Sequence, residues 1–436
     1  MEILVHFAQA HETFRKPEIE AVAELGGFGI QFTEYSLNSP FALTMLQNEQ
    51  QATHLSRSIL VKAFYELWGS GTTYDDVHIS LRARLTRVWK EKYLNQNFKF
   101  DIESYQGKRT NQEQRDIINS FSYLDLQGDV KMKNPELQFT VLEYWDEDAV
   151  TPKQIYMGRL LVFGSRTSID RYDVKKRQYI GNTTMDAELS LVTANFAHAA
   201  PGKLIYDPFA GTGSFLITSS HFGATTFGSD IDGRALRGKK DRSLLSNFHQ
   251  YGLVSKFGDT FVSDLTNTPL REVPGVNKRV FDAIVCDPPY GVREGLKVLG
   301  SKRPEREKGP LIMNGSLRHT QPDYVPPKRP YSFNSMMNDI LHFAAIHLVA
   351  GGRLCMWMPT ANDDLSPLAI PSHPQLELKA ACIQTFNKWS RQLLTYSRRP
   401  VTANDEEQAE RYRQERKEEE LERKTADELN DFRRKV

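Results

Sequence analysis

Short apolar segments alternate with helical stretches after about residue 180, and this rhythm constrains the fold more than any other feature of the chain. KLIYD, TTFGSD, VSKFGD, FDAIVCD and RLCMWMP predict buried strands. Helices are expected around 214–221, 234–251 and 335–348. Strands and helices in alternation predict a doubly wound parallel sheet. ELKAACIQTFN and WSRQLLTYSR predict an antiparallel pair that closes it.

About the first 170 residues predict a pair of small α+β units. EILVHFA, FKFDIES, LQFTVLEYW and IYMGRLLVFG predict strands, and KPEIEAVAELGG and QEQRDIINSF predict helices. ATHLSRSILVKAFYELWGSG has apolar residues at helical spacing and predicts a further helix that ends in glycine. The fold class is therefore α/β, with an α+β region in front of the parallel sheet.

The bulk properties exclude several classes of protein. At 436 residues the chain exceeds one ordinary core, so two or three domains are expected. No stretch approaches the roughly 20 apolar residues of a membrane helix, and the first residues lack the features of a signal peptide. The three cysteines form no CxxC pair, so neither a zinc site nor a disulfide framework is predicted, and a cytoplasmic location is expected.

The net charge of +1 hides an uneven distribution of charge. Residues 402–436 hold 12 acidic and 9 basic side chains, which predicts a solvated, helical or disordered tail. Three basic clusters stand out, and each is either a nucleic-acid contact or an ordinary solvated face. Their members are Arg82, Arg84, Arg87, Lys90 and Lys92; Lys175, Lys176 and Arg177; and Lys302, Arg303, Arg306 and Lys308.

The first motif, DPFAGTGSF, follows KLIY at residues 207–215. Gly211 and Gly213 allow a tight turn and a close approach of the backbone to a ligand. A dinucleotide fingerprint would carry a third glycine where this chain has Leu216, and Asp207 faces a cation better than a pyrophosphate. S-adenosylmethionine, with its ammonium and sulfonium groups, is therefore the predicted cofactor, and an NAD enzyme is disfavoured.

Two acidic motifs follow the next strands. In GSDID, Asp230 is the predicted acceptor for the ribose hydroxyls of the cofactor. Asp232 is the second candidate, and it would otherwise cap a helix that starts at about Gly233. In FGDTF, Asp259 is placed after the next strand and predicted to bind the adenine amino group.

CDPPYG, at 286–291, indicates the reaction. The lone pair of an exocyclic amine is delocalised into the ring, so the amine needs two hydrogen-bond acceptors to become nucleophilic. The Asp287 carboxylate and the Pro288 carbonyl can accept its N–H groups, and Asp287 can take up or pass on the released proton. Tyr290 can stack on the base, and Pro288 and Pro289 stiffen the loop. We interpret Cys286 as a core thiol, since this chemistry needs no covalent adduct.

Together with YIGNTTMDAELS, these motifs resemble those of the methyltransferases that join a THUMP RNA-binding domain to a Rossmann-like catalytic domain. HFAQAHETFRKPEIEAVAE is similar to the catalytic subunit of the eukaryotic tRNA (guanine-N2) methyltransferases acting on position ten. The resemblance extends to about residue 400. It implies a ferredoxin-like domain at 1–85, a THUMP domain at 86–170, a class I methyltransferase domain at 171–400 and a charged tail at 401–436.

The resemblance also implies a substrate, a partner and site residues. The substrate would be a guanosine of tRNA, unstacked to reach the DPPY loop, and the partner a small zinc-binding activator protein. The predicted catalytic residues are Asp287, Pro288, Pro289 and Tyr290. The predicted cofactor-binding residues are Thr183, Thr184, Asp186, Asp207, Phe209, Gly211, Gly213, Asp230, Asp232 and Asp259.

Three alternatives stay open at this point. The DPPY loop also suits adenine N6 or another guanine of tRNA or rRNA. From a different class, the chain could be a non-catalytic RNA-binding protein on a methyltransferase fold, which the intact Asp287 and glycine loop disfavour. The proline-rich, basic segment 292–334 is either a functional lid or RNA-contacting loop or a disordered one.

Overall fold

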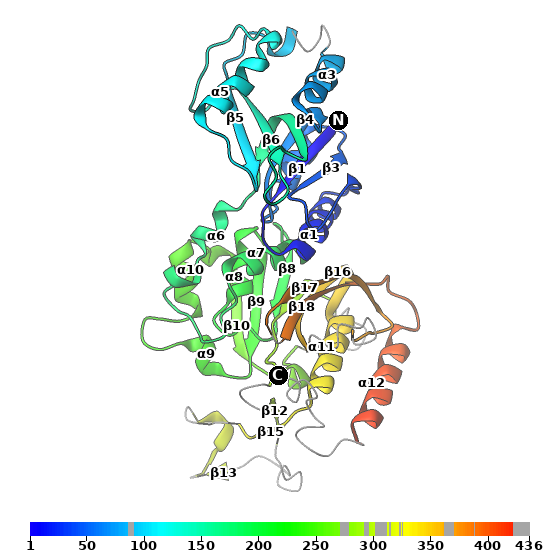
Figure 1. Ribbon diagram of the computed structural model, residues 1–436. Helices are drawn as coiled ribbons and strands as arrows, with labels where there is room; N and C mark the ends of the chain where they lie inside the picture. Colours follow the sequence, from blue (N-terminus) through cyan, green and yellow to red (C-terminus); the bar gives the residue numbers. More distant parts are fainter. Residues whose placement is uncertain are drawn as a thin grey trace. The chain divides into compact units, whose positions relative to one another are not determined.

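The computed structural model describes residues 1–85, 91–270, 279–291, 296–300, 312–313, 315–321, 324, 326–361, 370–387 and 389–421. The chain divides into two compact units, Met1–Thr167 and Ser168–Val436 (Figure 1). Each unit contains one seven-stranded sheet. The predicted domain boundaries at residues 85, 170 and 400 stay predictions.

The sheet of the first unit has the order β2-β3-β1-β4-β7-β6-β5, and only its β5–β6 pair is parallel. Alternate residues of its strands enter cores on opposite faces, since Ile3 and Val5 belong to one cluster and Leu4 to another. The strands are β1 (Glu2–Phe7), β2 (Phe32–Glu34), β3 (Phe41–Met45), β4 (Val61–Gly71), β5 (Phe98–Tyr105), β6 (Leu137–Tyr144) and β7 (Gln154–Phe163). The helices are α1 (Glu12–Leu25), α2 (Glu49–Leu55), α3 (Tyr74–Arg84), α5 (Asn111–Ser120) and the 3-10 turn η1 (Ser122–Leu124).

One predicted helix of this unit is wrong. The segment 52–71 holds only the end of α2, and its second half is strand β4. Val61–Gly71 is rich in apolar and aromatic residues and is buried on both faces of the sheet between β1 and β7, so its apolar residues show no alternation. The strands and the other helices predicted before residue 165 are confirmed.

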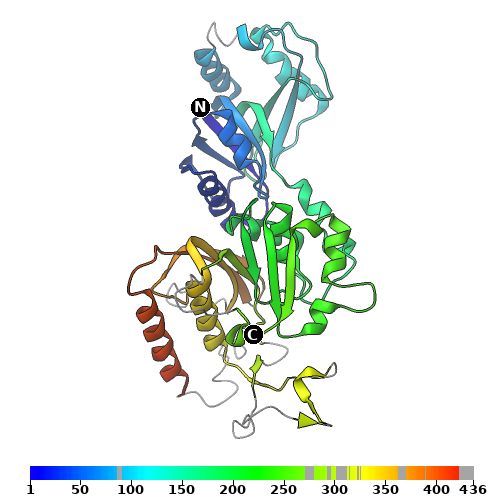
Figure 2. The same ribbon diagram turned by 180° about the vertical axis from the view of Figure 1, so that it is seen from behind.

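The sheet of the second unit has the order β10-β9-β8-β11-β16-β18-β17 (Figures 1 and 2). Its first five strands are parallel, and β18 is antiparallel to both β16 and β17, as predicted. The strands are β8 (Leu204–Asp207), β9 (Thr225–Asp230), β10 (Phe257–Val262), β11 (Phe281–Cys286), β16 (Leu348–Ala361), β17 (Leu376–Thr385) and β18 (Trp389–Arg398). The helices are α6 (Thr167–Arg171), α7 (Ala187–Phe196), α8 (Ser214–His221), α9 (Gly233–Arg237), α10 (Leu244–Tyr251), α11 (Phe333–His347) and α12 (Asp405–Leu421).

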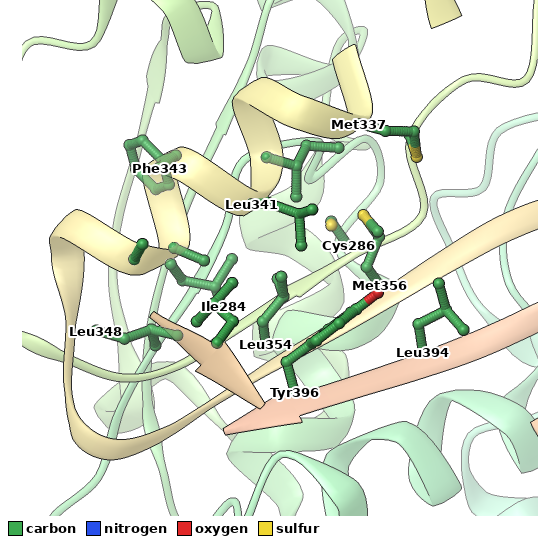
Figure 3. Packing of buried hydrophobic residues seen from close by; sticks show 14 of the residues in the cluster. Ile284, Cys286, Met337, Leu341, Phe343, Leu348, Leu354, Met356, Leu394 and Tyr396 are labelled. Atoms are coloured by element: carbon green, nitrogen blue, oxygen red, sulfur yellow. The ribbon is translucent and has the colours of Figure 1, made fainter. Parts of the chain in front are cut away.

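Helices cover both faces of this sheet. On one face α11 packs Met337 and Leu341 into a cluster with Ile284 of β11 and Met356 of β16 (Figure 3). The ring of Phe343, in the same helix, lies 5.7 Å from that of Tyr206 in β8. On the other face the buried indole of Trp357 donates a hydrogen bond to Thr193 Oγ1 of α7 (3.2 Å). The helix predicted over 234–251 is two helices, because Gly238 ends α9 with φ +68°. VSKFGD is also only partly a strand, since η3 (Val254–Lys256) precedes β10.

Short elements account for the described part of 292–334. β12 (Lys297–Leu299) pairs with β15 (Lys328–Pro330), and β13 (Ile312–Met313) pairs with β14 (Ser316–Leu317). η6 (Arg318–Thr320) follows β14. The role predicted for this segment as a lid or RNA contact stays a prediction.

The tail begins with a helix, which is one of its two predicted forms, but this helix is anchored to the sheet and is not solvated all round. Asp405 is 4% exposed, and Ala409 and Tyr412 of α12 are also buried. The Asp405 carboxylate accepts hydrogen bonds from Arg398, Arg279 (3.2 Å) and Thr402. The buried ion pair between Asp405 and Arg398 joins the start of α12 to β18. The composition of the tail gives no sign of this contact. Residues 422–436 of the tail lie outside the described residues.

We expect Asp405→Ala to lower the free energy of unfolding of the second unit by about 3 kcal/mol or more, because the buried guanidinium of Arg398 would lose its partner. Urea unfolding followed by circular dichroism measures the change. Glu407→Ala on the same helix removes only an exposed ion pair with Arg411, so it should cost less than about 0.5 kcal/mol. Equal effects of the two substitutions would contradict the anchoring role of Asp405.

Candidate active site

The loop between β8 and α8 carries the DPFAGTGSF motif. Gly211 (φ +51°) and Gly213 (φ +86°) adopt the left-handed conformation that favours glycine. Asp207 is 1% exposed, and its Oδ1 accepts a hydrogen bond from the Phe209 amide (2.9 Å). Leu216 lies in α8 and is fully buried. A core leucine therefore occupies the position at which a dinucleotide fingerprint would have its third glycine. The loop therefore has the turn geometry that its glycines predicted.

Asp230, at the end of β9, binds this loop directly. Its Oδ2 accepts a hydrogen bond from the Gly211 amide (2.9 Å), and its Oδ1 accepts one from the Asp232 amide (2.8 Å). Asp232 instead caps α9, where its Oδ1 accepts the Arg234 amide (3.0 Å) and its carboxylate pairs with the Arg234 guanidinium. Of the two candidates, Asp230 is thus the one that the structure joins to the glycine loop, and Asp232 has the capping position.

The prediction that Asp259 follows a strand is wrong. Asp259 is the third residue of β10, exposed, and its Oδ1 accepts the amide of Thr260 (2.7 Å). Asp264 stands just past the carboxyl end of β10 instead, and the neighbouring Ser263 amide donates to the Asp230 carbonyl (3.1 Å). The sequence pattern placed this strand at VSKFGD, but β10 begins only at Phe257 and ends at Val262. Asp264 was missed because the end of β10 is set by its pairing with β9, which the local sequence does not show.

The TTMD segment, residues 183–186, contacts the glycine loop through its second threonine. Thr184 Oγ1 lies 3.1 Å from Thr212 Oγ1, and it accepts a hydrogen bond from the Gly181 amide (2.8 Å). Asp186 caps α7 by accepting the Leu189 amide (2.9 Å), and Thr183 is exposed. The structure thus brings Thr184 beside the loop and makes Asp186 the start of the next helix.

The CDPPYG loop leaves the carboxyl end of β11. Cys286 is fully buried in the core, as predicted, Pro288 is buried and Pro289 is exposed. The Tyr290 hydroxyl donates a hydrogen bond to Asp287 Oδ1 (2.6 Å). Burial raises the pKa of Asp287 to about 6, while this hydrogen bond and the charge of Arg391 oppose the rise. Asp287 is therefore a carboxyl group that changes its ionisation close to neutral pH.

Aromatic and basic residues from β18 and from the turn that precedes it complete the surroundings of this loop, and none of them was predicted. The Tyr290 ring meets Trp389 edge to face at a centroid distance of 6.0 Å, and Trp389 stacks on Phe386 at 4.6 Å. Arg391 interacts with both Asp287 and Tyr290. The available signal was the period of a strand, since Trp389 and Arg391 are two residues apart and share a face of β18.

The carboxyl groups of the site favour a cationic ligand. Burial raises the pKa of Asp207 well above its ordinary value, and the charges of Asp230 and Asp287 raise it further. Burial also raises the pKa of Asp230. Carboxyl groups that repel one another in a buried site are stabilised by a positive charge brought among them, and destabilised by a pyrophosphate.

These residues fit S-adenosylmethionine, whose sulfonium and ammonium groups are cationic. Arg177 fits its carboxylate: the side chain is 5% exposed and donates from Nη1 to Ser214 Oγ (2.8 Å) at the start of α8. Its Nε and Nη2 meet no acceptor among the described residues. A buried guanidinium with two unused donors next to a helix N-terminus suits a carboxylate group.

The described residues can be compared with what a metal site and a membrane-spanning helix require. Over the described ranges, no group of three or more His, Cys, Asp or Glu side chains is arranged to hold a metal ion. The helices of those same ranges include none that is long and apolar enough to cross a membrane.

The basic clusters differ in how far they can be placed. In the first unit, Arg82 lies over the ring of Tyr123 at 4.3 Å, and Arg84 pairs with Glu2. Arg87 and Lys90 lie outside the described residues, as does the whole cluster Lys302, Arg303, Arg306 and Lys308. In the cluster Lys175, Lys176 and Arg177, Arg177 is 5% exposed and bonded to Ser214, so it is neither part of a solvated face nor open to a nucleic acid. A nucleic-acid contact by the other basic residues stays a prediction.

Known proteins match both units of the chain. Residues 1–166 match the family described as the Tmrp11 THUMP N-terminal domain, and residues 175–301 match the RMKL-like methyltransferase domain. A tRNA (guanine(10)-N(2))-methyltransferase of Saccharomyces cerevisiae is 43% identical over 412 residues, which are 92% of this chain and 94% of that protein. The Schizosaccharomyces pombe protein of the same name is 41% identical over 91% of this chain and 89% of its own length. The Homo sapiens tRNA (guanine(10)-N(2))-methyltransferase TRMT11 is 35% identical, over 90% and 87% respectively.

We expect Asp230→Asn to weaken S-adenosylmethionine binding at least about tenfold, because the carboxylate binds the glycine loop and is the predicted acceptor for the ribose hydroxyls. Isothermal titration calorimetry measures the affinity. Asp232→Asn is the matched control, since its helix-capping acceptor is retained, and it should bind the cofactor within about twofold of the native chain. Loss of affinity in the control alone would reverse the two assignments.

Proposed function

This chain belongs to the tRNA (guanine(10)-N(2))-methyltransferase family, and we propose that it transfers the methyl group of S-adenosylmethionine to N2 of guanosine 10 in tRNA. One observation carries the proposal for the reaction. The Asp287 carboxyl of the DPPY loop and the Asp207 loop leave adjacent parallel strands, so an acceptor for an amine and a site for a cationic cofactor stand side by side.

The DPPY loop would bind and orient the target amine. Asp287 and the Pro288 carbonyl accept its two N–H bonds, which draws the nitrogen lone pair out of the ring and toward the methyl group. Asp287, with a pKa of about 6, then takes up the released proton or passes it to water. Pro289 stiffens the loop. Tyr290 has two proposed roles, holding Asp287 in place before the base enters and packing against the base afterwards.

The remaining site residues would hold the cofactor, which supplies the electrophilic methyl group. Asp207, Phe209, Gly211 and Gly213 shape the loop around it. Asp230 accepts from the ribose hydroxyls. Asp264 replaces Asp259 as the proposed partner of the adenine amino group, because it stands at the strand end beside Asp230. At the methionine end we propose the residues Thr183, Thr184, Asp186 and Arg177.

We further propose that the first unit binds the tRNA and that the chain works in the cytoplasm. Its match to a THUMP N-terminal domain and the tRNA named by its relatives support the first point. A small zinc-binding activator protein is the proposed second subunit, on the strength of the family resemblance alone. Co-purification of the full chain with such a protein, and higher activity of the pair than of the chain, would support this partner.

The substrate is tested by incubating the full chain, with and without the activator, with unmodified tRNA and labelled S-adenosylmethionine, and then identifying the nucleosides. We expect labelled N2-methylguanosine, which disappears when guanosine 10 alone is replaced. Label in N6-methyladenosine would contradict the proposed base but not the methyl transfer. Absence of label with the activator present would contradict catalysis itself.

We expect Asp287→Ala to reduce kcat by about 10²-fold or more, the typical contribution of a positioned acid–base group. Cofactor affinity should change only a few-fold, because Asp287 faces the target amine. Single-turnover kinetics and calorimetry measure the two effects. Asp259→Ala serves as the control, since its exposed carboxyl is in the middle of β10. A retained rate above about a tenth of the native value would contradict the role of Asp287.

A further inference from the structure

Arg391 is a largely buried guanidinium between two parts of the site. It is the third residue of β18, pairs in register with Pro359 of β16 and Gln384 of β17, and its side chain is 15% exposed. An arginine at this depth in a sheet needs partners that offset its desolvation. Its contacts explain how the charge is held.

Two contacts fix the orientation of the guanidinium. Nε donates a hydrogen bond to Gln384 Oε1 (2.6 Å), and the guanidinium carbon lies 4.8 Å from the ring centroid of Trp357. Trp357 is itself fully buried and bound to α7. A planar cation stacked on an immobile indole loses little freedom when it makes further hydrogen bonds, so Arg391 is preorganised.

The remaining donors face the site. Arg391 donates a hydrogen bond to the Tyr290 hydroxyl, whose own proton is donated to Asp287 Oδ1 (2.6 Å). Its charge also acts on Asp287 directly. On the other side, Nη2 lies 3.5 Å from Asp186 Oδ2, at the end of the TTMD segment. One guanidinium therefore links the DPPY loop to the segment that leads to Thr184.

We propose that Arg391 is a positioning residue of the methyl-transfer site, which keeps Asp287 ionised and Tyr290 in place through the Arg391–Tyr290–Asp287 chain. The inference rests on the proposed function and adds a residue to it. Arg391 touches no reacting atom in this scheme. It acts by supplying a positive charge beside the partly buried carboxylate of Asp287.

The charges around Asp287 determine the direction of the effect. Asp287 faces Tyr290 on its own loop, Asp207 on β8 and Arg391 on β18, and Cys286 precedes it on β11. The charge of Asp287 disfavours the ionisation of Asp207, whereas the charge of Arg391 favours the ionisation of Asp287. Without the guanidinium, the pKa of Asp287 should rise above its present value of about 6. The ionised form that accepts the amine would then be lost at a higher pH.

The test is the pH dependence of single-turnover methylation of tRNA by the full chain with its activator, from pH 5.5 to 9, for the native chain, Arg391→Lys and Arg391→Met. We expect Arg391→Met to move the acid limb upward by about one pH unit, so that the rate falls about fivefold near pH 6 and recovers to within a few-fold at pH 8.5. Arg391→Lys, which keeps the charge, should stay near the native limb. A loss that is uniform across pH, or an unmoved limb, would overturn the proposal.

Two further measurements cover the other outcomes. If Arg391→Met does not fold, Gln384→Leu removes the Nε acceptor and should move the limb in the same direction by less, and an unmoved limb would overturn the proposal. If the native chain methylates no guanosine, the proposed function fails, and the titration of Asp287 itself then decides the inference. Followed by the NMR chemical shift of its carboxyl carbon, Asp287 should titrate at a higher pH in Arg391→Met than in the native chain, and identical titrations would overturn it.

Discussion

The parallel pairing of β8 with β9 on one side and β11 on the other is the constraint on which the site depends. Tyr206 pairs with Phe227 and with Ile284, so the three strands end at one edge of the sheet within a residue or two of each other. The acidic residue that closes each strand is therefore delivered to the same place. The register is held because α11 and α7 bury the two faces of the sheet, and a shift by one residue would expose the core.

The gathering of carboxyl groups at this edge has an energetic cost. Asp207, Asp230 and Asp287 are drawn out of water and repel one another, and all three have raised pKa values. Backbone amides of Phe209, Gly211 and Asp232 offset part of that cost, and Arg391 supplies a charge from β18. A cation among these carboxyl groups would reduce their mutual repulsion. The cationic cofactor that we propose would therefore stabilise the site when it binds.

The structure also separates residues that the sequence presents as equivalent. Asp230 and Asp232 are two positions apart, yet one binds the glycine loop and the other caps a helix. Asp259 and Asp264 both belong to the region of β10, but only Asp264 stands past its end. Charged residues of both signs run throughout the tail at 402–436. Asp405 is nevertheless buried, in an ion pair with Arg398. In each case a contact with a residue distant in the chain makes the difference.

The local sequence determined the strands, the glycine turns and the order of the motifs, because these follow from apolar periodicity and from backbone conformations that few residues tolerate. It therefore predicted α8, the parallel sheet, the paired last strands and the loops carrying Asp207, Asp230 and Asp287. The tertiary structure alone decided that Val61–Gly71 is a strand, where β10 ends, and that Trp389 and Arg391 stand beside Tyr290. Those features depend on partners that are tens to hundreds of residues away. Because β4 is buried on both faces, its sequence does not alternate between apolar and polar residues. The neighbours of Trp389 and Arg391 across the sheet are set by the order of the strands.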